Sequence, residues 1–337
     1  MAHTIVAVDC MGGDNAPQEI VKGAIEAVNK NQNIIVKLVG IESAVKEELS
    51  KYTFDENRVE IVNATEVIET AEPPVIAIRT KTDSSLVKAM NLVKTGEADG
   101  LVTAGSTGAT LVGGQVLVGR IKGVKRPPLA PLIPTVNGPK LLIDCGANVD
   151  AKPMNLVQFA HIGSVYMENV MGIRNPKVAI VNIGTEEEKG NALVKETFPL
   201  LNQEEGINFI GNVEARDIPL GEADVIVCEA FVGNVILKMY EGVGSVLLKK
   251  IKGTLVSSLK TKIGALLIKG PLKNTLKEFD ISEYGGAPIL GLNGLVVKTH
   301  GSAKSVEVCN SILQCIPFKE MNINDKIIEK ISKGKEE

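Results

Sequence analysis

Aromatic residues, cysteines and excess charge are all scarce in this sequence, and each shortage excludes a class of protein. Aromatic residues make up 3% of the chain, and tryptophan is absent. Nucleic-acid modules that stack bases on exposed rings are therefore not expected. The formal net charge of −3 argues further against general nucleic-acid binding. The five cysteines are scattered without a C-x-x-C pair, so we expect reduced thiols, a cytoplasmic protein and no metal site.

Long apolar runs and the common catalytic motifs are also missing. We find no run that approaches the ~18–20 residues needed to cross a bilayer, and the direct entry into the strand-like Thr4–Val8 predicts no signal peptide. The sequence contains no G-x-x-x-x-G-K-[ST], no G-x-G-x-x-G after the first strand, no H-E-x-x-H and no G-x-S-x-G. Walker nucleotide sites, ordinary Rossmann NAD sites, zinc proteases and α/β-hydrolases are thus disfavoured.

A repeated pattern of strand, glycine-containing loop and helix dominates what is present. Hydrophobic residues make up 44% of the 337 residues, enough for one large α/β domain or two lobes. The strands that we predict include Thr4–Val8, Ile34–Val39, Gly100–Ala104, Val178–Ile183 and Leu295–Thr299. Alternation of strands and helices predicts an α/β three-layer sandwich with a mainly parallel sheet. We expect a single domain over residues 1–337.

Five polar loops follow predicted strands and lead into predicted helices. They are Gly12–Asn15, Gly105–Ala109, Gly184–Gly190, Gly233–Asn234 and Gly301–Ser302. Backbone N–H groups at a helix start bind anions, and ligands of open α/β sheets bind beyond the carboxyl ends of the strands. One such loop is usually a tight turn, but five at one edge of a sheet favour an anionic ligand.

Single residues near these loops have two interpretations each. His300 ends a strand and is a better acid–base candidate than His161, which lies in an apolar helix. Lys189 and Lys238 either neutralise a phosphate or lie on a solvated face. Asp9 and Asp14 flank the first loop, where capping and a functional role are equally good explanations. The thiols near strand ends, at positions 10, 145 and 228, are better explained as small buried groups than as nucleophiles.

Seven segments in order resemble one known family. They are VAVDCMGGDNAP, GEADGLVTAGSTGA, RPPLAPLIPT, LLIDCGANVD, VNIGTEEEKG, FVGNVILKMYEG and YGGAPILGLNGLVVKTHGS, between residues 6 and 302. The sequence resembles the bacterial phosphate acyltransferases, which make acyl phosphate from acyl-acyl carrier protein for phospholipid synthesis. That family has a fold similar to phosphotransacetylase and, more remotely, to isocitrate dehydrogenase. It usually carries Ala at Cys10, Val at Cys145, Asn at Ser106 and Asp-Gly at Glu229-Ala230.

The resemblance implies direct transfer of a fatty acyl group from acyl-acyl carrier protein to inorganic phosphate, without metal or organic cofactor. It also implies a homodimer at the membrane surface, with the membrane glycerol-3-phosphate acyltransferase as a further partner. The catalytic candidates are His300, Lys189 and Asn234. The candidates for binding substrate or phosphate are Asp9, Gly12, Gly13, Asp14, Ser106, Thr107, Gly108, Asn148, Asn182, Thr185, Glu186, Lys238 and Ser302.

Three alternative functions stay open at this point. One is a phosphotransacylase that acts on short acyl-CoA, and another is an NAD-dependent decarboxylating dehydrogenase. The third is a non-catalytic membrane scaffold for lipid enzymes. The missing dinucleotide motif speaks against the dehydrogenase.

The segment Gly242–Lys277 has eight lysines and no acidic residue. Its charge of +8 leaves −11 for the remainder of the chain, since the total is −3. We predict a protruding helical element over residues 240–282: two helices joined by an apolar tip at Gly264–Ile268. Leu266, Leu267 and Ile268 would then insert into a membrane surface while the lysines meet anionic lipid. A solvated hairpin, a dimer contact or a site for the acidic carrier protein are the alternatives.

Overall fold

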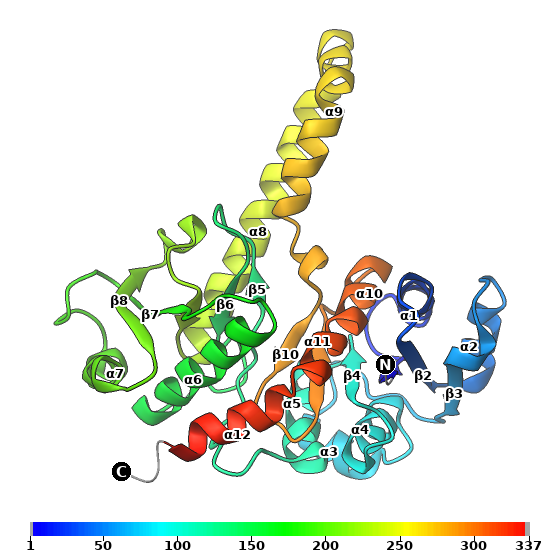
Figure 1. Cartoon of the computed structure of the whole chain (residues 1–337). Helices are drawn as coiled ribbons and strands as arrows, with labels where there is room; N and C mark the ends of the chain where they lie inside the picture. The colour runs from blue at the N-terminus through cyan, green and yellow to red at the C-terminus, as the bar shows by residue number, and fades with distance from the viewer. Residues whose placement is uncertain (1–2, 334–337) are drawn as a thin grey trace.

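The strands form two sheets, one in each lobe of the computed structural model, which describes residues 3–333 (Figure 1). The first sheet has the strand order β10-β11-β4-β1-β2-β3. Its strands are parallel except β10. Their bounds are β1 Thr4–Asp9, β2 Ile34–Gly40, β3 Val59–Asn63, β4 Gly100–Thr103, β10 Ala287–Ile289 and β11 Leu295–Lys298. Because β11, β4 and β1 are neighbours, their carboxyl ends bring three of the predicted loops together.

The second sheet has the order β5-β6-β9-β7-β8, with β5 antiparallel to the others. Its strands are β5 Leu132–Ile133, β6 Lys140–Ile143, β7 Lys177–Asn182, β8 Asn208–Glu214 and β9 Val225–Val227. The carboxyl ends of β6 and β9 lead to residues that face the first lobe. The chain therefore has two sheets in two lobes, the second of the two arrangements that its length suggested.

Helices cover both faces of each sheet. The α-helices are α1 Gln18–Lys30, α2 Glu42–Leu49, α3 Pro74–Thr80, α4 Ser85–Thr95, α5 Thr107–Gly113, α6 Pro153–Asn169, α7 Ala192–Gln203, α8 Ala230–Leu255, α9 Leu259–Glu278, α10 Ser305–Leu313, α11 Cys315–Glu320 and α12 Ile323–Lys333. Short 3₁₀ or π turns occupy Glu56–Arg58, Gly114–Val118, Ile218–Leu220 and Ile281–Tyr284.

Alternate residues of the buried strands belong to different core clusters, which defines the layers. In β1, Val6 and Val8 pack with α1 and α10, whereas Ala7 packs with Leu86 and Met90 of α4. The second sheet repeats this arrangement, with α6 against one face and the start of α8 against the other. Each lobe is thus a helix–sheet–helix sandwich, which confirms the predicted fold class.

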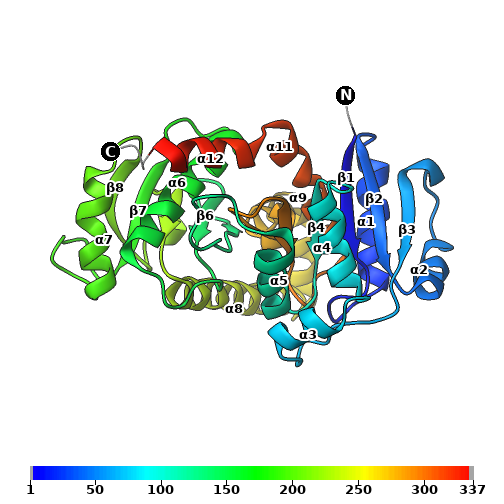
Figure 2. The ribbon, with the colours of Figure 1, turned by 90° about the horizontal axis from the view of Figure 1, so that it is seen from below.

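The carboxyl-terminal helices tie the two lobes together. α11 packs beside β1 of the first lobe, and α12 continues along α6 of the second lobe (Figure 2). Ile323, Ile327 and Ile331 of α12 are buried in the same cluster as Val6 and Phe159. One continuous core therefore runs through both lobes.

The protruding helical element is a hairpin of α8 and α9 that leaves the body between the lobes (Figure 1). The prediction of two helices is correct, but the position of the turn is wrong. The chain turns at residues 256–258, and Leu266 to Ile268 lie inside α9. Ser258 starts α9 through a capping box with Thr261. Once nucleated, the helix tolerates Gly264 in its interior at a cost of about 1 kcal/mol.

α8 corrects a second expectation. Over 18 residues its mean hydropathy is 1.3, so by length and composition this helix is long and apolar enough to cross a membrane. This helix was not predicted as a possible membrane span because Lys238 and Glu241 interrupt its apolar run. Ala230 and Gly233 are buried in the body, and Asn234, Lys238 and Glu241 line a pocket between the lobes. The first turns of α8 thus belong to the folded body.

Candidate active site

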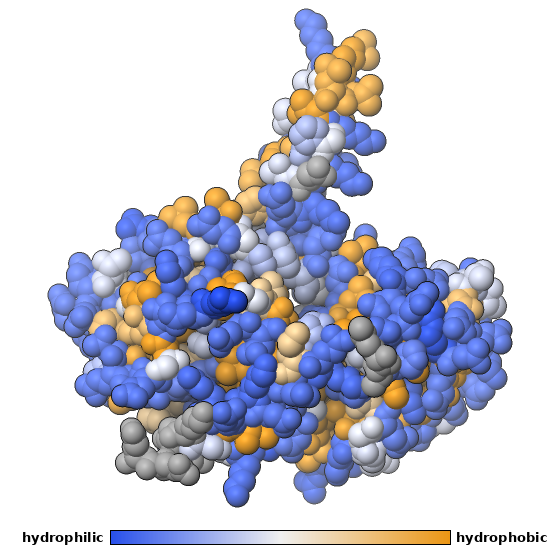
Figure 3. Space-filling model, in the orientation of Figure 1, coloured by the Kyte–Doolittle hydropathy of each residue, from blue (hydrophilic) through white to orange (hydrophobic). Residues whose placement is uncertain are grey.

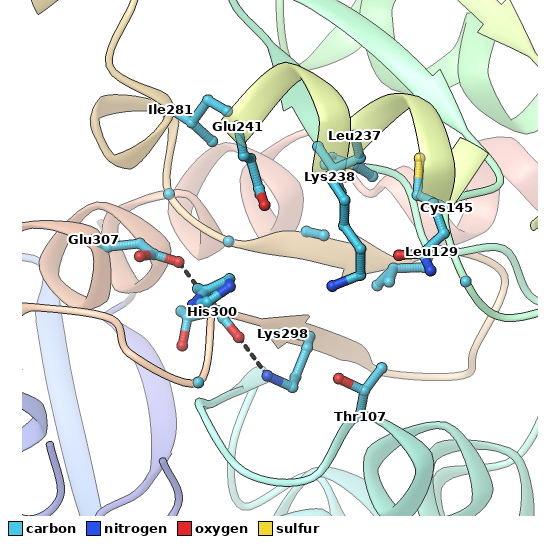
Figure 4. A pocket seen from close by; sticks show the side chains of 18 residues that line it. Thr107, Leu129, Cys145, Leu237, Lys238, Glu241, Ile281, Lys298, His300 and Glu307 are labelled. Atoms are coloured by element: carbon cyan, nitrogen blue, oxygen red, sulfur yellow. Dashed lines mark hydrogen bonds between the residues drawn. The ribbon is translucent and has the colours of Figure 1, made fainter. Parts of the chain in front are cut away.

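A pocket of about 380 Å³ lies where the two lobes meet the base of the hairpin (Figure 4). The first lobe contributes Thr107, the end of β11 and Glu307 of α10. The second lobe contributes Leu129, Pro131 and Cys145 with the loop that follows it. α8 supplies Asn234, Leu237, Lys238 and Glu241, and the segment after α9 closes the remaining side. Groups far apart in sequence thereby surround one polar cavity.

Three of the predicted loops converge beside this pocket. The Asp14 N–H donates to the Gly301 carbonyl at 2.7 Å. A Cβ on Gly12 would lie 2.7 Å from the Gly105 nitrogen, and one on Gly13 would lie 2.8 Å from the Gly301 oxygen. The glycines at 12 and 13 are therefore explained by close packing of loop on loop.

The helix starts themselves are less available to an anion than the sequence suggested. The Glu229 carboxylate accepts hydrogen bonds from the N–H groups of residues 231 and 232, so α8 begins at residue 230 and Gly233–Asn234 lies inside it. Glu19 caps the Ser305 N–H of α10 at 2.8 Å. Asn191 caps α7, and Ser106 accepts from the Ala109 N–H of α5. At these four helix starts, protein side chains thus already accept hydrogen bonds from N–H groups that were expected to bind the anion.

The loop Gly184–Gly190 does not line the pocket. Asn182 donates to the Lys189 carbonyl at 3.1 Å, and Asn212 donates to the carbonyls of Thr185 and Glu186. Lys189 is exposed on this loop. The side chain of Asn182 holds its own loop in shape, and Lys189 is not among the residues that line the pocket with His300 and Asn234.

Among the predicted residues, Thr107, Asn234, Lys238 and His300 line the pocket together. Ser302 lies directly behind His300. Gly108 packs against Pro74, and a Cβ there would approach that ring to 2.6 Å. The remaining predicted residues of the three loops, Asp9, Gly12, Gly13, Asp14 and Ser106, support the pocket from outside its lining.

Asp9 and Asn148 have structural partners. The buried Asp9 carboxylate accepts from the Thr103 hydroxyl at 2.7 Å, and burial raises the pKa of this carboxyl. Asn148 donates to Asp144 at 2.7 Å, while Asp144 also accepts from the Gly146 and Ala147 N–H groups. These carboxylates shape the loops at the ends of β1 and β6. Burial raises the pKa of the pocket-lining Cys145 thiol well above its ordinary value, which disfavours a nucleophilic thiolate.

Lys298, which the sequence analysis missed, lies at the base of the pocket. Its side chain is almost fully buried, and its ammonium donates to the carbonyls of Ala104 and Thr299. Burial lowers the pKa of Lys298 to about 8, while the nearby charges of Glu307 and Asp9 oppose that shift. A third N–H of the ammonium remains for a ligand. The available signal was a lysine at the end of the otherwise apolar strand Leu295–Lys298.

Glu307 is a second group that the sequence analysis missed. Its carboxylate accepts from the backbone N–H of His300 at 2.7 Å (Figure 4). Burial raises the pKa of Glu307 to about 7, with Lys298 acting in the opposite direction. Near neutral pH this carboxyl is therefore partly protonated, which reduces its repulsion of an anion in the pocket.

The surroundings of His300 fix the ring nitrogen that carries its proton. The Ser302 N–H donates to Nδ1 at 3.2 Å, and the Ser302 hydroxyl contacts the same nitrogen at 2.8 Å. Nδ1 thus acts as the acceptor, which assigns the proton of the neutral ring to Nε2. His161 of α6, by contrast, lies 2.8 Å from the Glu204 carboxylate, and burial lowers the pKa of this histidine. His161 has the structural role that the sequence predicted.

Comparison with solved structures defines the class of fold. The structure is similar to the EutD phosphotransacetylase from Staphylococcus aureus, with a TM-score of 0.60 at 18% identity over 95% of this chain and 94% of that one. A phosphotransacetylase from Streptococcus pyogenes gives a TM-score of 0.59 at 17% identity, with 94% of each chain covered. The two-lobed sandwich is therefore the phosphotransacetylase fold.

The sequence comparisons give the family. A family model described as "Fatty acid synthesis protein" matches residues 4–326. The chain is 50% identical over 333 residues to the phosphate acyltransferase of Clostridium acetobutylicum, covering 99% of both chains. It is 48% identical to that of Clostridioides difficile, covering 98% of this chain and 97% of the other. The chain belongs to the phosphate acyltransferase family, as its motifs predicted, and is an acyltransferase.

Proposed function

We propose that this enzyme transfers a fatty acyl group from acyl-acyl carrier protein to inorganic phosphate, giving an acyl phosphate for phospholipid synthesis. The observation that carries the proposal is the pocket between the lobes, which combines two lysines, a histidine and an amide on different elements. These are groups that bind a phosphate, stabilise an oxyanion and supply a proton.

The acyl transfer proceeds in two steps within this pocket. A phosphate oxygen attacks the thioester carbonyl carbon and gives a tetrahedral oxyanion. When this intermediate collapses, the C–S bond breaks and the carrier leaves as a thiolate. Phosphate is already an anion at neutral pH, so no strong base is needed to activate it.

Each side chain has a distinct role in that scheme. Lys298 and Lys238 neutralise the phosphate, and Thr107 donates a hydroxyl hydrogen bond to it. The Asn234 amide donates to the oxyanion. His300 donates a hydrogen bond from Nε2–H to the sulfur of the leaving thiolate, which takes its proton from solvent. Among residues 3–333, no group of three His, Cys, Asp or Glu side chains is arranged to hold a metal ion, and the scheme uses none.

We propose that the enzyme works as a homodimer in the cytoplasm, at the surface of the membrane. The exposed apolar side chains of α8, which include Phe231 and Leu247, support a contact with a second copy. The side chains of Leu266 and Leu267 in α9 are 72% and 79% exposed, and hydrophobic groups gather toward the outer end of the hairpin (Figure 3). Insertion of such side chains stabilises membrane contact by about 1.5–3 kcal/mol each when fully buried. The membrane glycerol-3-phosphate acyltransferase would then receive the product.

The substrate is tested by phosphate-dependent release of free carrier thiol from palmitoyl-acyl carrier protein, measured beside release of CoA from acetyl-CoA. We expect rapid release from the acyl carrier protein that requires phosphate, and little from acetyl-CoA. The reverse preference would establish the second candidate, a phosphotransacylase for short acyl-CoA, which the shared phosphotransacetylase fold favours. Absence of phosphate-dependent release from either donor would refute both.

A further inference from the structure

A second cavity adjoins the pocket at the base of the hairpin. It has a volume of about 720 Å³ and lies between α8, the segment after α9 and the second lobe. Two residues, Glu241 and Ile281, line both cavities. The two cavities are therefore neighbours, on either side of these side chains.

The second cavity is apolar along most of its length. Its lining includes Val235, Met239, Val243, Leu248 and Phe279. The side chains of Met239, Val243 and Phe279 are 66%, 53% and 42% exposed. Apolar side chains that remain this exposed around a groove mark a surface that is covered during function. The pocket at its inner end is polar, so the combined site suits a molecule with one polar end and a long apolar part.

The helical periodicity of α8 places the two kinds of group side by side. Residues 235, 239 and 243 follow one another at intervals of four and form a stripe along the helix. Asn234, Lys238 and Glu241 occupy the adjacent face and line the pocket. A single rigid helix thus presents polar groups to the reacting end of a substrate and an apolar stripe beside them.

We propose that this groove, the acyl groove, holds the hydrocarbon chain of the acyl donor while its thioester lies in the pocket. This inference rests on the proposed function and adds the location of the chain and the residues that select its length. The position of this apolar groove next to the polar pocket, across Glu241 and Ile281, favours the acyl chain over a second copy of this protein.

The test fills the groove and compares acyl chains of different length. In Val243→Trp, we expect kcat/KM for palmitoyl-acyl carrier protein to fall at least tenfold, with the value for butyryl-acyl carrier protein changed less than twofold. Val246→Trp is the matched control, because Val246 is 61% exposed on the same helix but lines a different depression. We expect this control to leave both values within twofold of the wild type.

Two results would overturn the acyl groove. Equal loss for both chain lengths in Val243→Trp, accompanied by dissociation of the protein in light scattering, would assign the groove to an interface between copies. Unchanged kinetics with both donors would leave the chain outside the groove. Neither result concerns the proposed function, which fails only if the wild-type enzyme releases no carrier thiol in response to phosphate.

Discussion

The pocket and the hairpin use lysine in opposite ways. Lys298 is buried among carbonyl groups, and its pKa is lowered to about 8. The lysines of the hairpin, such as Lys260 and Lys269, are exposed on two helices that protrude from the body. A buried ammonium acts on one ligand at short range, because low dielectric strengthens its field. Exposed ammonium groups act together on a large charged surface and are screened by salt.

The largest loss of activity that this comparison predicts follows from replacing Lys298. Replacing it with methionine keeps the length of the side chain but removes the charge that faces phosphate. We expect kcat/KM to fall by roughly 10²–10³-fold, the usual loss when one preorganised electrostatic donor is removed. Lys304→Met is the control, since Lys304 is exposed outside the pocket. Activity of Lys298→Met within threefold of the wild type would contradict the assignment.

The next effect concerns the hairpin and the membrane. In Leu266→Glu/Leu267→Glu we expect binding to vesicles of anionic phospholipid to fall more than tenfold in flotation assays, with turnover in solution unchanged. Ile183→Glu/Ile210→Glu adds the same charge to exposed apolar positions of the body and serves as the control. Equal flotation of all three proteins would refute the membrane contact.

A smaller effect is expected at Glu307, on the pH dependence of the unfolding free energy. The sign of this effect follows from the raised pKa of the Glu307 carboxyl. Burial raises the pKa of Glu307 from its ordinary value of 4.5 to about 7. Between these values the folded state binds more protons than the unfolded state, so this residue's contribution to stability is lost as pH rises. Relative to Glu307→Gln, the wild type should lose about 2–3 kcal/mol of unfolding free energy between pH 4.5 and pH 7. Urea unfolding at several pH values measures the difference, and a constant difference would contradict the burial.

The smallest effect on kinetics is expected when a single exposed lysine of the hairpin is replaced. Lys262→Gln removes one of many exposed charges, so KM for acyl-acyl carrier protein should rise about twofold at low salt and converge with the wild type at 0.5 M salt, where screening is strong. Lys22→Gln on the body is the comparison. A large effect that persists at high salt would show that Lys262 makes a specific contact.

The strands and the loops of the first lobe could be predicted because their signals are local. Thr4–Asp9 and Leu295–Lys298 are apolar runs flanked by glycine-containing loops, and the loops at 12, 105 and 301 converge as expected. Lys298 and Glu307 were not predicted, because their burial depends on elements that are distant in the chain. The caps were hidden for the same reason: Glu19 reaches Ser305 across 286 positions. The turn of the hairpin was misplaced because the glycine and proline pattern outweighed the capping box at Ser258.

Lys189 shows where the motif and the geometry diverge. Its loop is held by Asn182 and Asn212 and lies outside the lining of the pocket. The resemblance placed Lys189 in the chemistry with His300, and that assignment stays a prediction. Lys189→Met separates the two possibilities, since a role through loop shape alone would leave the KM for phosphate unchanged.

The central claim is that phosphate is held beside the buried Lys298 between the lobes. Its most direct test is a crystal structure of the protein soaked in inorganic phosphate, compared with an identical soak of Lys298→Met. We predict an anion within hydrogen-bond distance of the Lys298 ammonium and the Thr107 hydroxyl, absent from the variant. An anion bound at Gly184–Gly190 in both crystals, with none in the pocket, would contradict the account.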